Sequence, residues 1–324
     1  MKGGVNASCL ASCEAPVRSP HGPIEIRLRM SLDLSPHTTA AVAPLSAAGL
    51  RWIAPWLIGI ALLIAAVLER HLVGANTDVG WLLTAGEKWL SGQRLYGEVL
   101  ETNPPIAVLT YLPAIVIGRA LGIAPEIVVD ALVFVAALLS IAACALILRG
   151  ADLAITRRPW WLGLSAVAVL LLLPAQSFGQ REQVALIALL PMLALGARRA
   201  AGSPVTFWMS LVAGSGAGLT LCFKPHFAAA VAAAPLVAAW CVRSWRPLFA
   251  SECWIAGVAV VLSGALTLWF VPDYVAIVVP LVRDVYLQLP RPVAHLLFGE
   301  PVADRKSTRL NSSHESVSRM PSSA

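Results

Sequence analysis

Charged residues are scarce in this sequence. Only 13% of its 324 residues are Asp, Glu, Lys or Arg, whereas an ordinary soluble domain carries about 25%. The hydrophobic share is 58% and the mean hydropathy is +0.74. This balance excludes a soluble globular protein and indicates that many apolar residues face lipid and one another in a membrane.

Paired metal-binding residues are also missing. Four cysteines stand singly in or beside apolar segments, without paired ligand spacing: Cys144, Cys222, Cys241 and Cys253. The sequence has no Gly-rich nucleotide loop, and its basic residues form neither a basic helix nor an aromatic-basic patch. We therefore predict no cofactor and no nucleic-acid partner. A divalent metal ion is left open, with no residue pattern to support it.

Apolar runs recur along the chain with short polar breaks between them. A bilayer core about 30 Å thick requires roughly 20 apolar residues per helix. We expect about seven crossing helices, at 52–68, 126–148, 160–176, 183–198, 204–222, 227–243 and 254–271. The first run is too long for a signal-peptide core and lacks a convincing cleavage site, so it is predicted to remain as an anchor. The fold class is therefore all-α, a polytopic transmembrane helical bundle.

Segment 105–123 is apolar but contains Pro113 and Gly118 and follows two prolines. The positive-inside rule indicates whether this segment crosses the membrane, because Lys and Arg in short loops accumulate on the cytoplasmic side. If the segment does not cross, Arg181 and Lys224 are the cations of the short outer loops, and seven arginines lie inside together with Arg51. These seven are Arg149, Arg157, Arg158, Arg198, Arg199, Arg243 and Arg246. We therefore predict that 105–123 is a re-entrant or interfacial segment on the outer face, and that the N-terminus is cytoplasmic.

The composition divides the chain into three parts. Residues 1–50 show neither helical nor strand periodicity and are predicted to be a disordered cytoplasmic leader. Residues 51–304 form the predicted transmembrane core. Residues 305–324 are Ser-rich and polar, and the stretch from Lys306 to His314 resembles translated sequencing-adapter read-through. We interpret this tail as an artefact and the chain as the N-terminal part of a longer protein, the alternative being a disordered native tail.

The predicted topology gathers several polar residues on the outer face. They are Asp78, Glu101, Arg181, Glu182, Lys224, His226 and Asp273. Ionisable residues at membrane depth are costly and often functional, although each residue taken singly is better explained as a solvated loop residue. An amphipathic interfacial helix is predicted after Thr77, which can cap it. Asp78 lies in the first turn of this helix, where the helix dipole favours a carboxylate; the alternative is that Asp78 only caps.

The residues after this helix resemble a known family. The turn Gly92-Gln-Arg-Leu-Tyr96 and the stretch Glu101-Thr-Asn-Pro-Pro105 follow an Asp at the start of an outer-face helix. This order is similar to the first outer loop of GT-C-type glycosyltransferases, which include the protein O-mannosyltransferases and the lipid A aminoarabinose transferases. The resemblance covers roughly residues 52–286, including the later turns 178–182 and 222–226. The closely paired acidic residues of the mannosyltransferases are absent at Asp78, which argues against a metal-dependent or closely paired mechanism.

The resemblance implies transfer of a sugar from a polyprenyl-phosphate donor to a lipid, glycan or protein acceptor at the outer face of a bacterial inner membrane. Such a reaction needs a carboxylate for the acceptor hydroxyl. Asp78 is the first candidate and Glu101 the second. Arg181 and Lys224 are candidate phosphate-binding residues, with headgroup contact as the alternative. Glu182, His226 and Tyr96 are further candidate substrate contacts, although a simple loop role for Glu182 and His226 and an interfacial role for Tyr96 are the favoured alternatives. The competing hypotheses are a secondary transporter or lipid flippase and a non-catalytic envelope scaffold.

Overall fold

The computed structural model describes residues 47–286, which form helices joined by short turns. Within this range there is no β-strand, and the one β-bridge joins Leu95 to Val99. The prediction of an all-α bundle is therefore confirmed. The predicted leader and the Ser-rich tail lie almost entirely outside the described residues.

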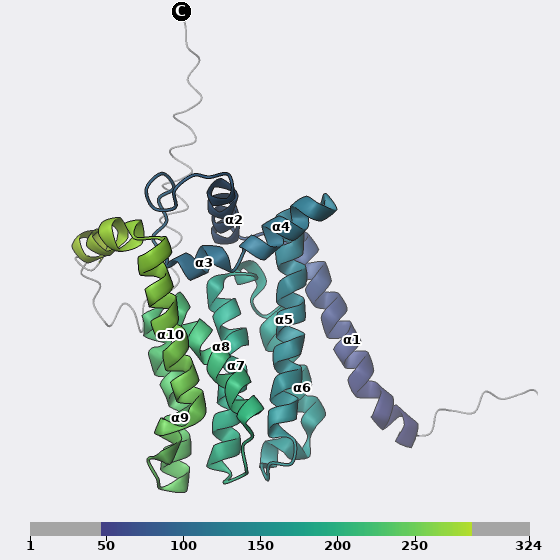
Figure 1. Cartoon of the computed structure of the whole chain (residues 1–324). Coiled ribbons are helices and arrows are strands. Elements are labelled where there is room, and N and C mark those ends of the chain that lie inside the picture. Colours follow the sequence, from purple (N-terminus) through teal and green to yellow (C-terminus); the bar gives the residue numbers. More distant parts are fainter. Residues whose placement is uncertain (1–46, 287–324) are drawn as a thin grey trace, which may run out of the picture. The chain divides into compact units, whose positions relative to one another are not determined.

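Seven apolar helices run along the bundle in the positions that the sequence predicts (Figure 1). They are α1 (Ala47–Val73), α5 (Pro125–Leu148), α6 (Pro159–Val167, continued by the π-turn η2, Ala168–Leu172), α7 (Arg181–Ala200), α8 (Phe207–Phe223), α9 (Ala228–Val242) and α10 (Ser251–Phe270). Five of these are long and apolar enough to cross a membrane: α1, α5, α7, α10, and α9 with its preceding turn. The other two, α6 with η2 (Pro159–Leu172) and α8 (Phe207–Phe223), are shorter apolar helices.

Three shorter helices lie together at one end of the bundle, which we call the α2 end (Figure 1). Helix α2 (Thr77–Leu90) is followed by α3 (Pro105–Leu109) and α4 (Leu112–Leu121). Helix α3 has five residues and α4 has ten. Each is too short by itself to cross a bilayer, since a helix rises about 1.5 Å per residue. Helix α4 ends at Gly122, whose φ of 67° is a left-handed conformation that glycine adopts without strain. Helices α3 and α4 lie at this end of the bundle, and the re-entrant or interfacial placement of segment 105–123 stays a prediction.

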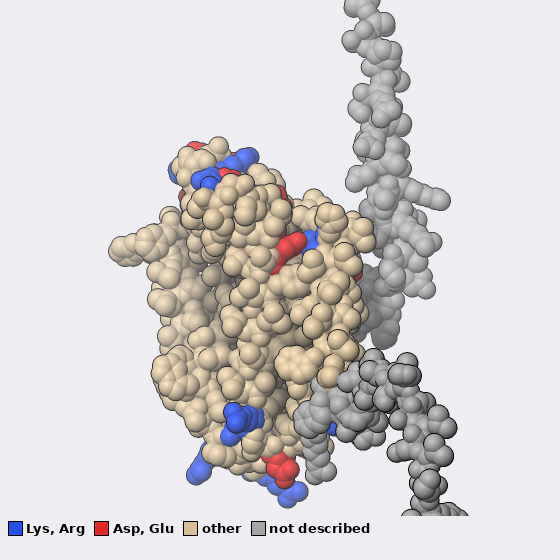
Figure 2. Space-filling model, turned by 90° about the vertical axis from the view of Figure 1, so that its right-hand side faces the viewer, with Lys and Arg blue, Asp and Glu red and all other residues tan. Residues whose placement is uncertain are grey.

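The opposite end carries most of the arginines, and we call it the arginine end. Its turns are 149–158, 201–206 and 243–250, and Figure 2 shows Lys and Arg side chains along this edge of the molecule. One arginine there has an internal role. The guanidinium of Arg198 is buried and donates to the backbone carbonyls of Ile147, Arg149 and Pro204 at 2.8, 2.9 and 2.6 Å. It therefore ties the ends of α5 and α7 together.

Close packing of small residues holds the centre of the bundle. Helix α8 packs between α7 and α10, and a Cβ at Gly216 would overlap the carbonyl oxygen of Ala188 on α7. A Cβ at Gly214 would lie 2.6 Å from the carbonyl oxygen of Glu252 on α10. Glu252 itself is 2% exposed and receives hydrogen bonds from Arg199 on α7 and Ser210 on α8. The three helices are thus joined by backbone proximity and by a buried ion pair.

Candidate functional site

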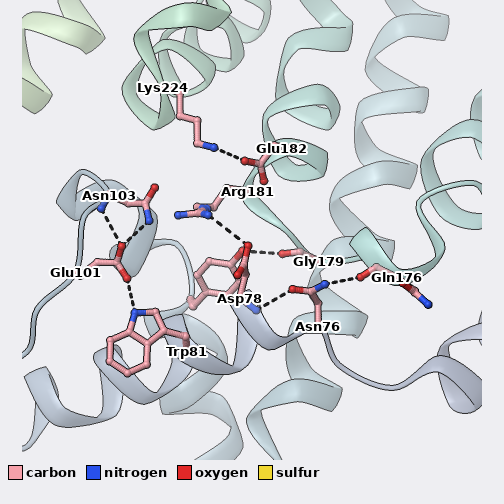
Figure 3. A network of polar contacts seen from close by, with 11 residues as sticks. Asn76, Asp78, Trp81, Glu101, Asn103, Gln176, Gly179, Arg181, Glu182 and Lys224 are labelled. Carbon is pink, nitrogen blue, oxygen red and sulfur yellow. Dashed lines mark hydrogen bonds and ion pairs between the residues drawn. The ribbon is translucent and has the colours of Figure 1, made fainter. Parts of the chain in front are cut away.

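Helix α2 begins close to the turn that precedes α7. Asn76 is the N-cap, and its side-chain oxygen accepts a hydrogen bond from the backbone amide of Asp78 at 2.8 Å. The Asn76 amide group also donates to the carbonyl of Gln176 at 2.7 Å, as Figure 3 shows. The prediction that Thr77 caps this helix is wrong. Asn76 has the extended backbone that a cap requires, and Thr77 is already helical.

Asp78 faces Arg181 across the start of the two helices. The distance from Asp78 Oδ2 to Arg181 Nη2 is 3.7 Å. The Asp78 side chain is 59% exposed, whereas the Arg181 side chain is only 11% exposed. The carboxylate is therefore open to solvent on one side and bordered by a nearly buried cation on the other.

Arg181 is incompletely satisfied by the protein. Its Nε and Nη1 atoms are buried and have no hydrogen-bond partner among the described residues. Buried polar atoms in native proteins nearly always have a partner, so such an exception requires an explanation. A guanidinium with free donors beside an open carboxylate is suited to receive an anionic ligand such as a phosphate.

Glu182 and Lys224 extend the charged cluster toward α8. The Lys224 ammonium donates to Glu182 Oε1, and Glu182 Oε2 is buried without a hydrogen-bond partner in the described part of the chain. Figure 3 shows Lys224, Glu182, Arg181 and Asp78 in succession. His226 follows in the exposed turn η4 (Pro225–Phe227), where its ring lies 4.6 Å from that of Phe227. The fold thus brings together four of the predicted site residues, from three separate parts of the sequence.

The turn that carries Arg181 is held by buried hydrogen bonds. Gly179 has a φ of 76°, and a Cβ there would lie 3.3 Å from Val129 and 3.6 Å from Val79. Its amide donates to the side-chain oxygen of Gln183, and its carbonyl accepts from the Tyr111 hydroxyl at 2.6 Å. The position of Arg181 is therefore fixed by α5, α7 and the junction between α3 and α4.

Glu101 lies in a different environment from Asp78. It is 3% exposed, and its carboxylate accepts hydrogen bonds from Trp81 Nε1 at 2.6 Å and from the Asn103 backbone amide at 2.8 Å. The Asn103 side chain provides a further donor (Figure 3). Because protein donors occupy both oxygens, Glu101 supports the loop, whereas the Asp78 carboxylate is open to solvent.

Tyr96 is an internal residue of the same loop. It is 2% exposed, its hydroxyl donates to the carbonyl of Asn103 at 2.6 Å, and its ring lies 5.1 Å from that of Tyr274. Burial raises the pKa of the phenol well above its ordinary value, and Tyr274 and Glu101 raise this pKa further. In this conformation the ring offers no exposed face to a sugar, so Tyr96 serves to fasten the loop to the residues after α10.

Arg70 is a central residue that sequence reasoning missed. Its side chain is 6% exposed and lies 3.2 Å from Asp130 Oδ2. The guanidinium also donates to the carbonyls of Gly74 and Ala175 and lies 4.7 Å from the centre of the Phe178 ring. The sequence signal was available, since Asp130 in an apolar helix requires a partner and Arg70 lies at the same end of the preceding span. This pair connects α1 and α5 to the turn before Arg181.

Among the described residues there is no group of three or more His, Cys, Asp and Glu side chains that could hold a metal ion. No protein-family model, no curated protein and no solved structure matches this chain.

Proposed function

We propose that this chain is the membrane core of a glycosyltransferase that takes a sugar from a polyprenyl-phosphate donor. The acceptor is a lipid, glycan or protein at the α2 end of the bundle. The observation that carries the proposal is the pairing of the solvent-open Asp78 carboxylate with the nearly buried Arg181, whose Nε and Nη1 have no partner among the described residues. The order of the loop motifs, similar to that of GT-C-type enzymes, supports it.

In the proposed reaction, the acceptor hydroxyl attacks the anomeric carbon of the sugar and gives its proton to Asp78. The bond between the anomeric carbon and the phosphate oxygen breaks, and the lipid phosphate leaves with the electron pair. Arg181 stabilises the growing negative charge on the phosphate, because a fixed and nearly buried cation acts strongly on developing charge. Lys224 adds a second cation when it exchanges Glu182 for the phosphate.

The proposed location is a bacterial inner membrane with the α2 end outside and the N-terminus in the cytoplasm. The arginine-rich turns at the opposite end support this orientation. In this arrangement the charged cluster lies at the interface where the phosphate of a polyprenyl donor would be found, while its hydrocarbon chain remains in the membrane.

The proposal predicts that Asp78→Asn in the full-length protein abolishes transfer without impairing membrane insertion, because an amide cannot accept the acceptor proton. The assay uses undecaprenyl phosphate carrying radiolabelled mannose or aminoarabinose, with lipid and peptide acceptors. The matched control is Glu98→Gln, an exposed carboxylate of the same loop that pairs only with Arg94 in the described region. Wild-type activity in Asp78→Asn would reject the assignment.

Binding of the donor is tested separately with undecaprenyl phosphate alone. Arg181→Gln should weaken this binding by about 10-fold or more, since a charged hydrogen bond contributes about 1.5–3 kcal/mol. Arg94→Gln, which alters an exposed cation at the same end, should leave binding unchanged. Equal binding of undecaprenyl phosphate by the wild type, Arg181→Gln and Arg94→Gln would show that the phosphate does not bind at Arg181.

A further inference from the structure

A large apolar groove lies between α5, α6 and α7, away from the charged cluster. Its volume is about 830 Å³, within the range of about 300–1,000 Å³ typical of ligand sites. It extends to the turn between α5 and α6 at the arginine end, where Arg149, Gly150 and Thr156 contribute to its lining.

Small side chains line the groove where α6 lies near α5 and α7. Helix α6 and η2 together span 14 residues, which is about 21 Å and less than a bilayer core. Gly163 and Ala166 on α6, Ala145 on α5 and Ala194 on α7 are small residues of this lining. A Cβ at Gly163 would meet no atom within 4 Å, so the space in front of this helix is open.

The lining is suited to a hydrocarbon chain. Apart from Arg149, its polar side chains are Cys144, Thr156 and Ser165, and the Thr156 hydroxyl already donates to the carbonyl of Leu153 at 2.7 Å. An acyl chain is narrow and flexible enough to occupy the groove.

Arg149 places a positive charge at the mouth of the groove. Its side chain is exposed, and in residues 47–286 it forms no ion pair. Its backbone is fixed, because its carbonyl accepts a hydrogen bond from the buried Arg198. Arg158 adds a second exposed cation in the same turn, against the single acid Asp152. Basic pockets between membrane helices at such an interface are suited to anionic headgroups.

We propose that this groove is a binding site for an anionic phospholipid of the leaflet at the arginine end. One acyl chain lies between α5, α6 and α7, and the phosphate contacts Arg149. The bound chain fills the groove and so supports the contact of α6 with α1 and α5. This site is independent of the proposed transfer reaction.

The test is native mass spectrometry of the purified full chain after equilibration with equal amounts of phosphatidylglycerol and phosphatidylcholine. We expect one retained phosphatidylglycerol per chain, favoured at least 5-fold over phosphatidylcholine. Gly163→Leu should abolish retention by filling the groove, whereas Gly257→Leu on α10, where a Cβ also meets no atom within 4 Å, should retain the lipid.

The role of the Arg149 charge is tested with a second pair of variants. Arg149→Gln should reduce the preference for phosphatidylglycerol to about 1-fold, and Arg246→Gln, an exposed arginine of the same end that does not line the groove, should leave it unchanged. Equal retention of both lipids by the wild type would indicate only surrounding bilayer lipid and overturn the proposal. Absence of retained lipid, or equal retention by Gly163→Leu and Gly257→Leu, would overturn it as well.

Discussion

At the scale of single residues, Asp78 and Glu101 show how local environment separates two carboxylates of one loop. Asp78 is mostly exposed and faces a cation, whereas Glu101 is buried and accepts hydrogen bonds from Trp81 and Asn103. Sequence spacing ranked Asp78 first but could not distinguish these environments, because the donors to Glu101 come from tertiary contacts. The same applies to Tyr96, whose burial depends on Tyr274, nearly 180 residues later.

Asn76 is expected to stabilise the site more than the neighbouring Thr77 does. Asn76→Ala removes the cap of α2 and the hydrogen bond to Gln176, which should cost about 1–2 kcal/mol and lower the melting temperature by about 2–6 °C. Thr77→Ala should change the melting temperature by less than about 1 °C. Thermal unfolding in detergent measures both, and an equal effect of the two substitutions would contradict this account of the cap.

The buried phenol of Tyr96 should make the folded protein less stable at alkaline pH. A phenol whose pKa is raised in the folded state contributes stability that is complete below its unfolded pKa of about 10 and is lost as the pH rises above it. The wild-type melting temperature should therefore fall between pH 10 and pH 11. Tyr96→Phe should be less stable near pH 8, by about 1 kcal/mol for the lost hydrogen bond. Its melting temperature should fall less steeply above pH 10 than that of the wild type. Parallel pH profiles for the two proteins would exclude this role.

At the scale of elements, the lengths of the helices follow the sequence more closely than their contacts do. The start and end of α5 and α8 lie within a few residues of the predicted bounds, because apolar runs and flanking turns define them. The sequence analysis treated 105–123 as one segment and did not place the break between α3 and α4. The shortness of α6 was not predicted either, since apolar residues continue through its π-turn and into the next turn.

Gly216 should be required for the packing of α7 against α8. Gly216→Ala introduces a methyl group that overlaps the backbone of Ala188, so the two helices must separate. We expect a loss of about 1–3 kcal/mol, the usual cost of overpacking a core. Gly257→Ala on α10 meets no neighbouring atom and should be neutral or stabilising by up to about 1 kcal/mol. Unfolding of both variants in detergent tests the difference, and equal stability would contradict the close approach of α7 and α8.

At the scale of the whole molecule, the two ends of the bundle have different chemistry. The α2 end gathers Asp78, Arg181, Glu182 and Lys224 from three parts of the chain, and the arginine end carries the groove with Arg149 at its mouth. The sequence predicted which residues share an end, because alternating crossings determine sidedness. The sequence placed Arg70 and Asp130 at the same end, but it did not show that Arg70 also contacts the turn before Arg181, because this contact depends on how the helices pack.

The most direct test of the account is the sidedness of the charged cluster. Single cysteines are introduced by Asp78→Cys, Lys224→Cys and Arg246→Cys in full-length protein whose six native cysteines are replaced, and intact cells are treated with a membrane-impermeant maleimide. Positions 78 and 224 should react from outside, and position 246 should react only after the cells are permeabilised. If positions 78 and 224 react from opposite sides, or both react only after permeabilisation, the proposed outer-face site does not exist.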